Sequence, residues 1–395
     1  MTAPTLDAEP ACPGSSERTP RPAPGPAPAY AEQRLFDSVP RATWDRLAAR
    51  TPWATPFSAW PFHRAWWDAY GDNAHDQTLV VCRGDGADAE PIAIVPLMHR
   101  HEVEPTDAVT HTTMRHGADL RLTPVPPTAT AILLGASYHA DYATILTEPD
   151  DLPAVAKAVA GYVASPASGA WDVVDLRRLR CADPTGTELA AAFGALEMAQ
   201  GWTLNVDRED VCPVATLPVG VDIETYLGTL GKKERHEIRR KVRRARAVGE
   251  VRLVDSADPL ADIDVFIDLH QRRWGDEGLF PPTRGGDQSR VLIRRLFELF
   301  GADGPLGLTM LWVGDRRIAA GLHFETGDEL LYYNAGIDPA ARELSPGVLM
   351  IYSYVQRALE RGIRRMDFLR GDEPYKYEWG AVDEPIQRVL VRRGS

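Results

Sequence analysis

The chain has few cysteines and no long apolar run. Its four cysteines, at positions 12, 82, 181 and 212 of 395 residues, show no CxxC spacing. Scattered thiols fit a reducing cytoplasm better than a disulfide framework or a zinc site. No uncharged apolar stretch is long enough to span a bilayer, and the beginning of the chain lacks the continuous apolar core of a signal peptide. These absences predict a cytoplasmic protein without a transmembrane segment.

A surplus of positive charge is also missing. The formal net charge is -12, whereas a general nucleic-acid binder needs cations to displace counterions from phosphate. We therefore expect no DNA partner. The histidines at 99, 101, 111 and 116 have neither a helical i,i+4 pairing nor a nearby cysteine, so we expect no metal site. No Ser/His/Asp or Cys/His pair has local support for a covalent intermediate.

The first 30 residues differ in composition from the rest. They contain eight Pro and six Ala and almost no large apolar side chains, so they cannot bury enough surface to offset the entropy of ordering. We predict a disordered tail over residues 1–30. The remaining chain is long enough for two domains of ordinary size.

The last third of the chain has a clear order of elements. Three apolar runs between residues 308 and 336 are separated by the turn sequences Gly314-Asp315 and Thr326-Gly327-Asp328, which predicts a three-strand antiparallel meander. Apolar residues then recur at helical spacing over residues 348–359, and Gly362 follows. A short strand is predicted over residues 365–369, and a charged, aromatic stretch begins where it ends.

The first half repeats this order more loosely. Residues 79–100 read as strand, Gly-rich turn and strand, DYATIL as a third strand, residues 152–165 as a helix, and WDVVDLRRL as a strand that aligns Asp175 with Asp367. A repeated order predicts two copies of one α/β unit. We place them at residues 31–210 and 211–395.

The C-terminal copy resembles a known family. The stretch LYYNAGIDPAARELSPGVLMIYSYVQRALERGIRRMDFLRGDEPYKYEWGA is similar to the acetyltransferase-like domain of the GNAT superfamily, specifically the CelD/BcsL type. The segments KKERHEIRRKVRRARAVGEV, PFHRAWWDAYGD, PIAIVPL and WDVVDLRRL extend the resemblance over most of residues 31–395. It implies two tandem GNAT-like domains, each a mixed, mostly antiparallel sheet flanked by helices, related to the peptidoglycan-bridge aminoacyl transferases. It also implies acyl transfer from a thioester or ester donor to an amine.

A candidate donor site lies where the loop at Ser345 enters the helix. The first N–H groups of a helix lack intrahelical partners and carry the positive end of the dipole, so Ser345, Gly347 and Val348 could cradle a pyrophosphate. An ordinary capped helix is the alternative, and the fuller Arg/Gln-x-x-Gly-x-Gly loop of coenzyme A-binding relatives is missing. The expected donor is acetyl-CoA or another acyl-CoA.

Candidate catalytic residues follow the last strand. Acyl transfer to an amine needs a proton acceptor for the amine and a proton donor for the leaving group. We assign the first role to Asp372 or Glu373 and the second to Tyr375, and we place Lys376 and Arg370 on the substrate side, where a cation can hold a phosphate or carboxylate. Alternatively, the two acids are solvated and the tyrosine packs on the sheet.

A basic segment stands out in this acidic chain. Residues 232–246 contain nine Lys or Arg and two Glu, and such a density of like charge repels within a helix unless an anion lies across it. Arg239 and Arg243 are our candidate contacts for coenzyme phosphates, an anionic acceptor, a membrane surface or transfer RNA. A solvated basic helix is the alternative.

A third candidate group contains His270, Arg273 and Trp274. Their spacing places them on one face of a predicted helix, and they resemble a substrate-side group in the family. The alternative is a core-facing tryptophan flanked by surface charges, because tryptophan is usually largely buried.

Three functions remain open. The first is an acyl-CoA-dependent N-acyltransferase whose acceptor is a small molecule or polymer carrying an amine. The second is an aminoacyl transferase that uses charged transfer RNA, favoured by the basic helix and disfavoured by the absence of a long coiled-coil arm. The third is a noncatalytic protein that binds an anionic polymer or membrane.

Overall fold

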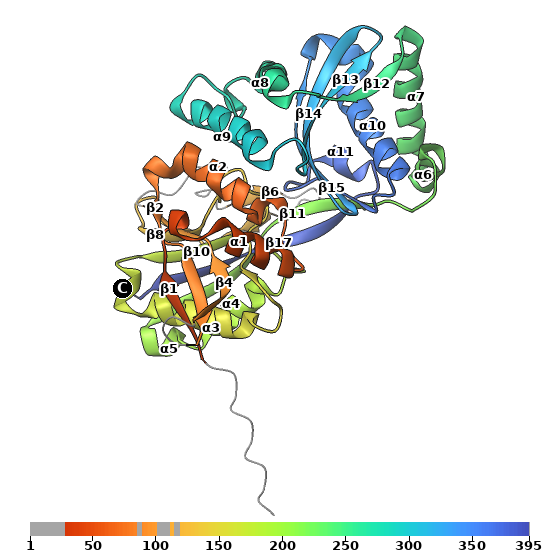
Figure 1. The fold of residues 1–395 in the computed structure, drawn as a ribbon. Coiled ribbons are helices and arrows are strands. Elements are labelled where there is room, and N and C mark those ends of the chain that lie inside the picture. The colour runs from red at the N-terminus through yellow and green to blue at the C-terminus, as the bar shows by residue number, and fades with distance from the viewer. Residues whose placement is uncertain (1–27, 85–88, 101–110, 114–118, 395) are drawn as a thin grey trace, which may run out of the picture.

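The N-terminal half combines strands and helices (Figure 1). The computed structural model describes residues 28–84, 89–100, 111–113 and 119–394. In chain order this half contains β1 (Ala29–Gln33), α1 (Arg41–Arg50), α2 (Trp60–Tyr70), β2 (His75–Asp76), β3 (Leu79–Arg83), β4 (Glu90–Val95), β5 (Leu97–Arg100), β6 (His111–Thr113), β7 (Asp119–Arg121), β8 (Ala131–Leu134), β9 (Leu146–Thr147), α3 (Leu152–Ala164), β10 (Val173–Arg180), α4 (Thr185–Gly194), α5 (Glu197–Gln200) and β11 (Trp202–Thr216).

The C-terminal half contains the predicted meander, helix and short strand. The meander is antiparallel and turns at Gly314 and Gly327, both with positive φ, a conformation that glycine adopts at no steric cost. In chain order this half contains α6 (Ile223–Thr229), α7 (Lys232–Val248), β12 (Val251–Asp255), α8 (Pro259–Trp274), α9 (Arg284–Phe300), β13 (Leu306–Val313), β14 (Arg316–Thr326), β15 (Glu329–Ile337), the 3₁₀ helix η7 (Pro339–Leu344), α10 (Pro346–Glu360), β16 (Arg365–Asp367), α11 (Pro374–Tyr377) and β17 (Val382–Arg393).

One sheet runs through both halves. Among the described residues it has eleven strands, in the order β12-β13-β14-β15-β16-β11-β17-β10-β8-β5-β2. The C-terminal strand β17 lies between β11 and β10, so the end of the chain joins the two halves. The boundary proposed at residues 210 and 211 falls within β11 and stays a prediction.

Each half contains a short parallel strand pair. β8 and β10 pair from Ala131↔Val173 to Leu133↔Asp175, and β15 and β16 pair from Glu329↔Arg365 to Leu331↔Asp367. The two aspartates aligned in the sequence therefore occupy the same third position of equivalent pairs. This geometry bears out the predicted α/β fold of two GNAT-like units.

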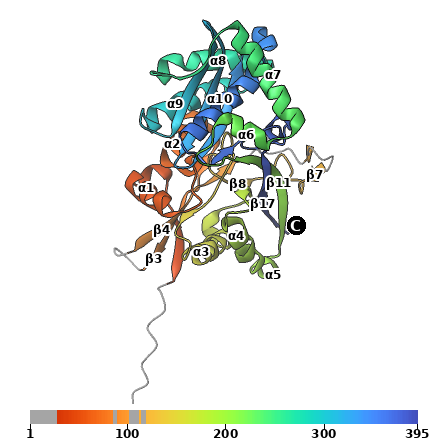
Figure 2. The same cartoon turned by 90° about the vertical axis from the view of Figure 1, so that its right-hand side faces the viewer.

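Helices cover both faces of the C-terminal part of the sheet (Figures 1 and 2). On one face α7 and α10 pack through Ile238, Val242 and Leu349. On the other face α8 and α9 pack against β13 to β15 and against α2 of the N-terminal half, where Trp66 and Leu292 share one apolar cluster. The two halves therefore have a common core.

Two sequence predictions need correction or restriction. DYATIL, residues 141–146, is not a strand, because β9 begins only at Leu146 and the preceding residues run along the seam between the halves. The tail predicted for residues 1–30 lies outside the described residues except for its last three, and Ala29 and Tyr30 begin β1. In the described residues, no helix has both the length and the apolar character needed to cross a bilayer.

Candidate active site

A cleft opens where β15 and β16 separate. Their parallel pairing ends at Leu331 and Asp367, yet β15 continues to Ile337. The chain turns away after Asp367 because Leu369 has φ 57° and Gly371 has φ 105°, and the N–H groups of Phe368 and Gly371 bond to β11 instead. Among the residues that the structure describes, the part of β15 beyond Leu331 therefore has no paired strand on this side.

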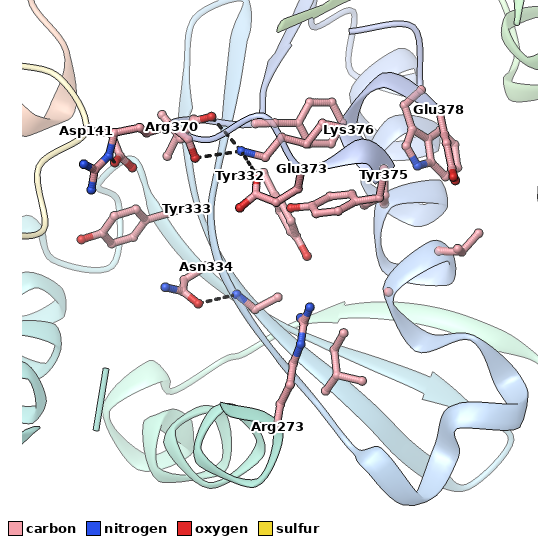
Figure 3. A pocket seen from close by; sticks show the side chains of 18 of the residues that line it. Asp141, Arg273, Tyr332, Tyr333, Asn334, Arg370, Glu373, Tyr375, Lys376 and Glu378 are labelled. Atoms are coloured by element: carbon pink, nitrogen blue, oxygen red, sulfur yellow. Dashed lines mark hydrogen bonds and ion pairs between the residues drawn. The ribbon is translucent and has the colours of Figure 1, made fainter. Parts of the chain in front are cut away.

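A cavity of about 450 Å³ occupies this cleft (Figure 3). Its walls come from β15, the loop after β16, the start of α10, the end of α8 and one residue of the N-terminal half. The lining residues are Asp141, Arg273, Trp274, Tyr332, Tyr333, Asn334, Ala335, Ile337, Gly347, Val348, Ile351, Phe368, Leu369, Arg370, Glu373, Tyr375, Lys376, Glu378 and Trp379.

The cavity brings together residues from three groups predicted separately. Eight of the thirteen candidate site residues line it: Arg273, Trp274, Gly347, Val348, Arg370, Glu373, Tyr375 and Lys376. The other candidates, Asp372, Ser345, His270, Arg239 and Arg243, are outside its lining.

Tyr375 is placed to donate a proton. Its side chain is 37 % exposed, and its hydroxyl lies near Tyr332 and Glu373 in the middle of the cavity (Figure 3). Burial of the hydroxyl, with smaller contributions from Tyr332 and Glu373, raises the pKa of Tyr375 well above its ordinary value. The phenol is therefore protonated at neutral pH, as a general acid must be.

Glu373 is the better placed of the two candidate bases. Its carboxylate lies 2.9 Å from Lys376 Nζ and is about half exposed. The carboxylate folds back over Gly371, where a Cβ would lie only 2.8 Å from Glu373 Oε2. Glycine is favoured at this position by its φ of 105°, whereas the Glu373 side chain could move to make room for a Cβ. Asp372 is not part of the lining, so direct contact with an amine in this cavity falls to Glu373.

Lys376 holds the loop. Its ammonium donates to the carbonyls of Leu369, Arg370 and Gly371 at 2.8 to 2.9 Å, and the side chain is buried. An ammonium has three protons, and all are used here. The sequence-based role for Lys376, holding a substrate phosphate or carboxylate, is therefore corrected: this lysine fixes the walls of the site.

The helix α10 begins at the far end of the cavity. A connected groove of about 670 Å³ is lined by Arg273, Arg342, Gly347 and Val348 among others. Arg273 stacks on Trp274, and within the described residues neither Arg273 nor Arg342 forms an ion pair. Ser345 is left-handed, with φ 55°, and its Oγ accepts a hydrogen bond from Arg244 at 2.7 Å. Positive charge therefore gathers at the N-terminus of this helix.

The prediction for α8 is confirmed in part. His270, Arg273 and Trp274 lie on this helix, but Trp274 is 43 % exposed and lines the cavity, so the alternative of a core-facing tryptophan is wrong. His270 is buried, which lowers its pKa to about 4. It packs on Phe280 beneath the cavity wall.

A buried acid, Asp367, ends β16 next to the cleft. Asp367 is fully buried and accepts hydrogen bonds from the Tyr142 hydroxyl at 2.6 Å and the Leu369 N–H at 2.7 Å. Burial raises its pKa to about 7, and the negative charges of Glu329 and Glu384 act in the same direction. Tyr142 belongs to the N-terminal half, so this contact ties the two halves together.

Sequence reasoning missed several lining residues. Tyr332, Tyr333 and Asn334 were assigned only to a strand, although the register of β14 and β15 shifts at this point and Tyr333 is the extra residue of a bulge. Bulges redirect side chains near active sites. Asp141 was also missed, because DYATIL was interpreted as a strand.

The comparisons with known proteins agree with this geometry. Residues 232–377 match the family model of the acetyltransferase (GNAT) domain. The chain therefore carries a GNAT-type acyltransferase domain, which includes the cleft, α10 and Tyr375. No curated protein matches the sequence.

A solved structure, FemX, has a similar fold. The chain is similar to FemX at 10 % identity, with a TM-score of 0.54 over 88 % of this chain and 96 % of that one; this likeness concerns the fold alone. A protein of unknown function from Bacteroides thetaiotaomicron matches at 13 % identity and a TM-score of 0.49, covering 90 % of this chain and 98 % of that one. A tandem GNAT protein from the clavulanic acid biosynthesis pathway matches at 10 % identity and a TM-score of 0.47, covering 93 % and 99 %.

Proposed function

We propose that the protein is a cytoplasmic N-acyltransferase of the CelD/BcsL type that moves an acyl group, acetyl in the simplest case, from acyl-CoA to an amine. The observation that carries the proposal is the cleft between β15 and β16, which leads from Tyr375 to the N-terminus of α10. An acyl thioester with a phosphorylated tail needs a binding site of this shape and charge. The match to the GNAT domain disfavours the noncatalytic alternative.

The two ends of the cleft suit the two ends of such a donor. The N–H group of Gly347 offers a hydrogen bond to the pyrophosphate, and Arg273 and Arg342 add charge beside it. Val348 lines the same groove, with its N–H donating to the Ser345 carbonyl at 3.1 Å. The free edge of β15 from Tyr332 to Ile337 offers backbone groups to the amides of the pantetheine arm, as an exposed strand edge does for an added strand.

The chemistry follows from the residues at the centre. The amine nitrogen attacks the thioester carbonyl carbon, an amide bond forms, and the C–S bond breaks. Glu373, or Asp372 through water, receives the proton that the amine loses, and Tyr375 gives a proton to the departing thiolate. Arg370, which lines the same cavity, is assigned to the substrate side in this proposal.

Calorimetry with acetyl-CoA tests the donor. We expect one binding event, and we expect acetylpantetheine, which lacks the pyrophosphate, to bind more weakly because it cannot reach α10. Release of free thiol in the presence of primary amines then measures transfer. Failure of acetyl-CoA to bind would contradict the proposal.

The basic helix favours a second candidate, aminoacyl transfer from charged transfer RNA. On α7, Arg239 pairs with Glu224 and Arg240 with Glu237, while within the described residues Arg243 forms no ion pair. Arg244 contacts Ser345 at the start of α10, so this basic surface borders the phosphate end of the groove.

Replacing Arg239, Arg240, Arg243 and Arg244 by Gln tests this surface. If an anion binds there, the variant should bind transfer RNA more weakly in gel shifts and show a flatter dependence on salt, with an unchanged melting temperature. An unchanged affinity at low salt would count against any anion-binding role. Arg284→Gln on α9, whose side chain is exposed, serves as the matched control.

A further inference from the structure

The N-terminal half reaches the cavity through one loop. Residues 135–142 follow β8, and two of them, Ala136 with φ 59° and His139 with φ 74°, are left-handed without being glycine. Each such residue costs about 1 to 2 kcal/mol. Strain of this kind persists only where the surroundings hold the chain in place, and it concentrates at functional sites.

Contacts with the C-terminal half hold this loop on both sides of Asp141. The Tyr333 hydroxyl donates to the carbonyl of His139 at 2.9 Å, and the Tyr142 hydroxyl donates to Asp367 at 2.6 Å. Asp141 lies between these two anchors. Its carboxylate is therefore presented to the cavity from a fixed backbone.

The Asp141 carboxylate has unused capacity to accept hydrogen bonds. Its side chain is only 17 % exposed, and within the described residues its one polar contact is Arg370 Nε at 3.4 Å, longer than an ordinary hydrogen bond. A carboxylate offers about four acceptor positions, and a charge that is largely removed from water normally has them filled. Figure 3 shows this group at one end of the cavity, beside Arg370.

Arg370 does not satisfy the whole Asp141 carboxylate. Its guanidinium interacts electrostatically with Asp210 and Glu209 as well as with Asp141, although Arg177 also pairs with Glu209 and Lys376 also acts on Asp210. The contact that joins Arg370 to Asp141 is to Oδ1, so within the described residues Oδ2 has no polar contact. An ammonium group could bind at Oδ2.

We propose that Asp141 binds the ammonium group of the acceptor, so that the acceptor is a primary amine that is cationic at neutral pH and lies against the N-terminal half. This inference rests on the proposed acyl transfer to an amine. Tyr333, Phe368 and Trp274 line the same cavity and suit an acceptor with an apolar or aromatic body next to its amine.

Benzylamine and benzyl alcohol, titrated separately into the full chain by ligand-observed NMR, test the inference. Wild type should bind the amine about tenfold more tightly than the neutral alcohol, because a charge-assisted hydrogen bond is at stake. Asp141→Asn should abolish that preference and leave the affinity for the alcohol unchanged. Asp315→Asn, at an exposed turn, should behave as wild type.

The outcomes separate a binding role from a structural one. If Asp141→Asn lowers the affinity for both ligands equally, or if wild type shows no preference for the amine, the inference is overturned. Should Asp141→Asn fail to fold, Asp141→Glu keeps the charge and should keep the preference; a folded Glu variant without it would equally refute the role.

Calorimetry with acetyl-CoA distinguishes failure of the inference from failure of the proposed function. If wild type binds acetyl-CoA normally but does not prefer the amine, only the role of Asp141 is refuted. An amine preference in a protein that does not bind acetyl-CoA defeats the proposed function and keeps the amine site.

Discussion

The two parallel strand pairs, β8–β10 and β15–β16, are alike for three residues and then differ. In the C-terminal half β15 runs on alone, and a cavity opens beside it. In the N-terminal half β8 ends at Leu134, and residues 140–143 return to cover β10, where the Ala143 N–H bonds to the Arg178 carbonyl at 3.0 Å. The same break in pairing therefore produces a cleft in one half and a filled seam in the other.

The equivalent aspartates differ in the same way. Asp175 forms a bidentate, fully buried ion pair with Arg388 of β17, at 2.6 and 2.7 Å. Asp367 has hydrogen-bond donors but, among the described residues, no ion pair with a cation, and its pKa is raised. In the closed half this position stabilises the sheet, whereas in the open half it retains a proton near the cleft.

The helices that lie between the two strands of each pair, α3 and α10, differ in the charge at their N-termini. α3 begins after Asp150 and Asp151, and Asp151 pairs with Arg83 at 2.9 Å. α10 begins after Ser345, with arginines alongside. The aspartates at the start of α3 interact favourably with the positive end of its dipole. The start of α10, next to arginines, can instead attract an anion.

Breaking the buried Asp175–Arg388 ion pair should have the largest effect on stability. Asp175→Asn leaves Arg388 largely unpaired in the core, which should lower the free energy of unfolding by about 3 kcal/mol. Chemical denaturation measures this loss. Asp367→Asn is the matched variant at the equivalent position and should cost much less at neutral pH; equal losses would show that the two halves use this position alike.

Tyr375→Phe should reduce turnover next most strongly. It removes the proton donor while keeping the ring, so turnover should fall about tenfold to a thousandfold with little loss of stability. Steady-state thiol release and a melting curve measure the two effects. Normal turnover in both Tyr375→Phe and Asp372→Asn would refute a catalytic role for the charged stretch after β16.

The positive charge near the N-terminus of α10 should change the affinity for acetyl-CoA about tenfold. Arg273→Gln combined with Arg342→Gln removes two unpaired cations from the groove, so acetyl-CoA should bind about tenfold more weakly. Calorimetry gives the affinity. Asp150→Asn at the start of α3 is the control and should leave it unchanged, since that helix has no role in donor binding on our proposal.

The last effect concerns the dependence of stability on pH. Because the pKa of Asp367 is about 7 in the folded protein and about 4 when unfolded, the stability that its proton gives is complete below about pH 4 and is lost as pH rises to about 7. Relative to Asp367→Asn, wild type should lose about 1 kcal/mol per pH unit in this window and be constant above it. Denaturation at several pH values measures the difference; a constant difference from pH 4 to 8 would contradict the raised pKa.

Local patterns were enough to predict much of the C-terminal half. Turn glycines, alternating apolar residues and helical spacing act over a few residues, so the meander, α10 and α7 could be read directly. The N-terminal half was predicted less well. DYATIL has the composition of a strand, but contacts from Tyr333 and Asp367 hold its neighbourhood as a loop, and such contacts lie outside any local pattern.

The site was predicted in pieces. Tyr375, Glu373 and Arg370 were found because charged and aromatic residues follow a strand. Asp141 was missed because its partner Arg370 is far away in sequence. Lys376 was given the wrong role, since its charge suggested a ligand while three nearby carbonyls use all its protons.

By itself the sequence determined the element types, the acidic balance with one basic helix, and the short motif that carries Tyr375, because these depend on neighbouring residues. Tertiary structure decided which parallel pair stays open, which ionisable groups are buried, and that Asp141 of one half lines the same cavity as Tyr375 of the other. Those outcomes depend on backbone breaks and contacts between residues more than two hundred positions apart, such as Tyr142 with Asp367, and on the burial that raises the pKa of Asp367.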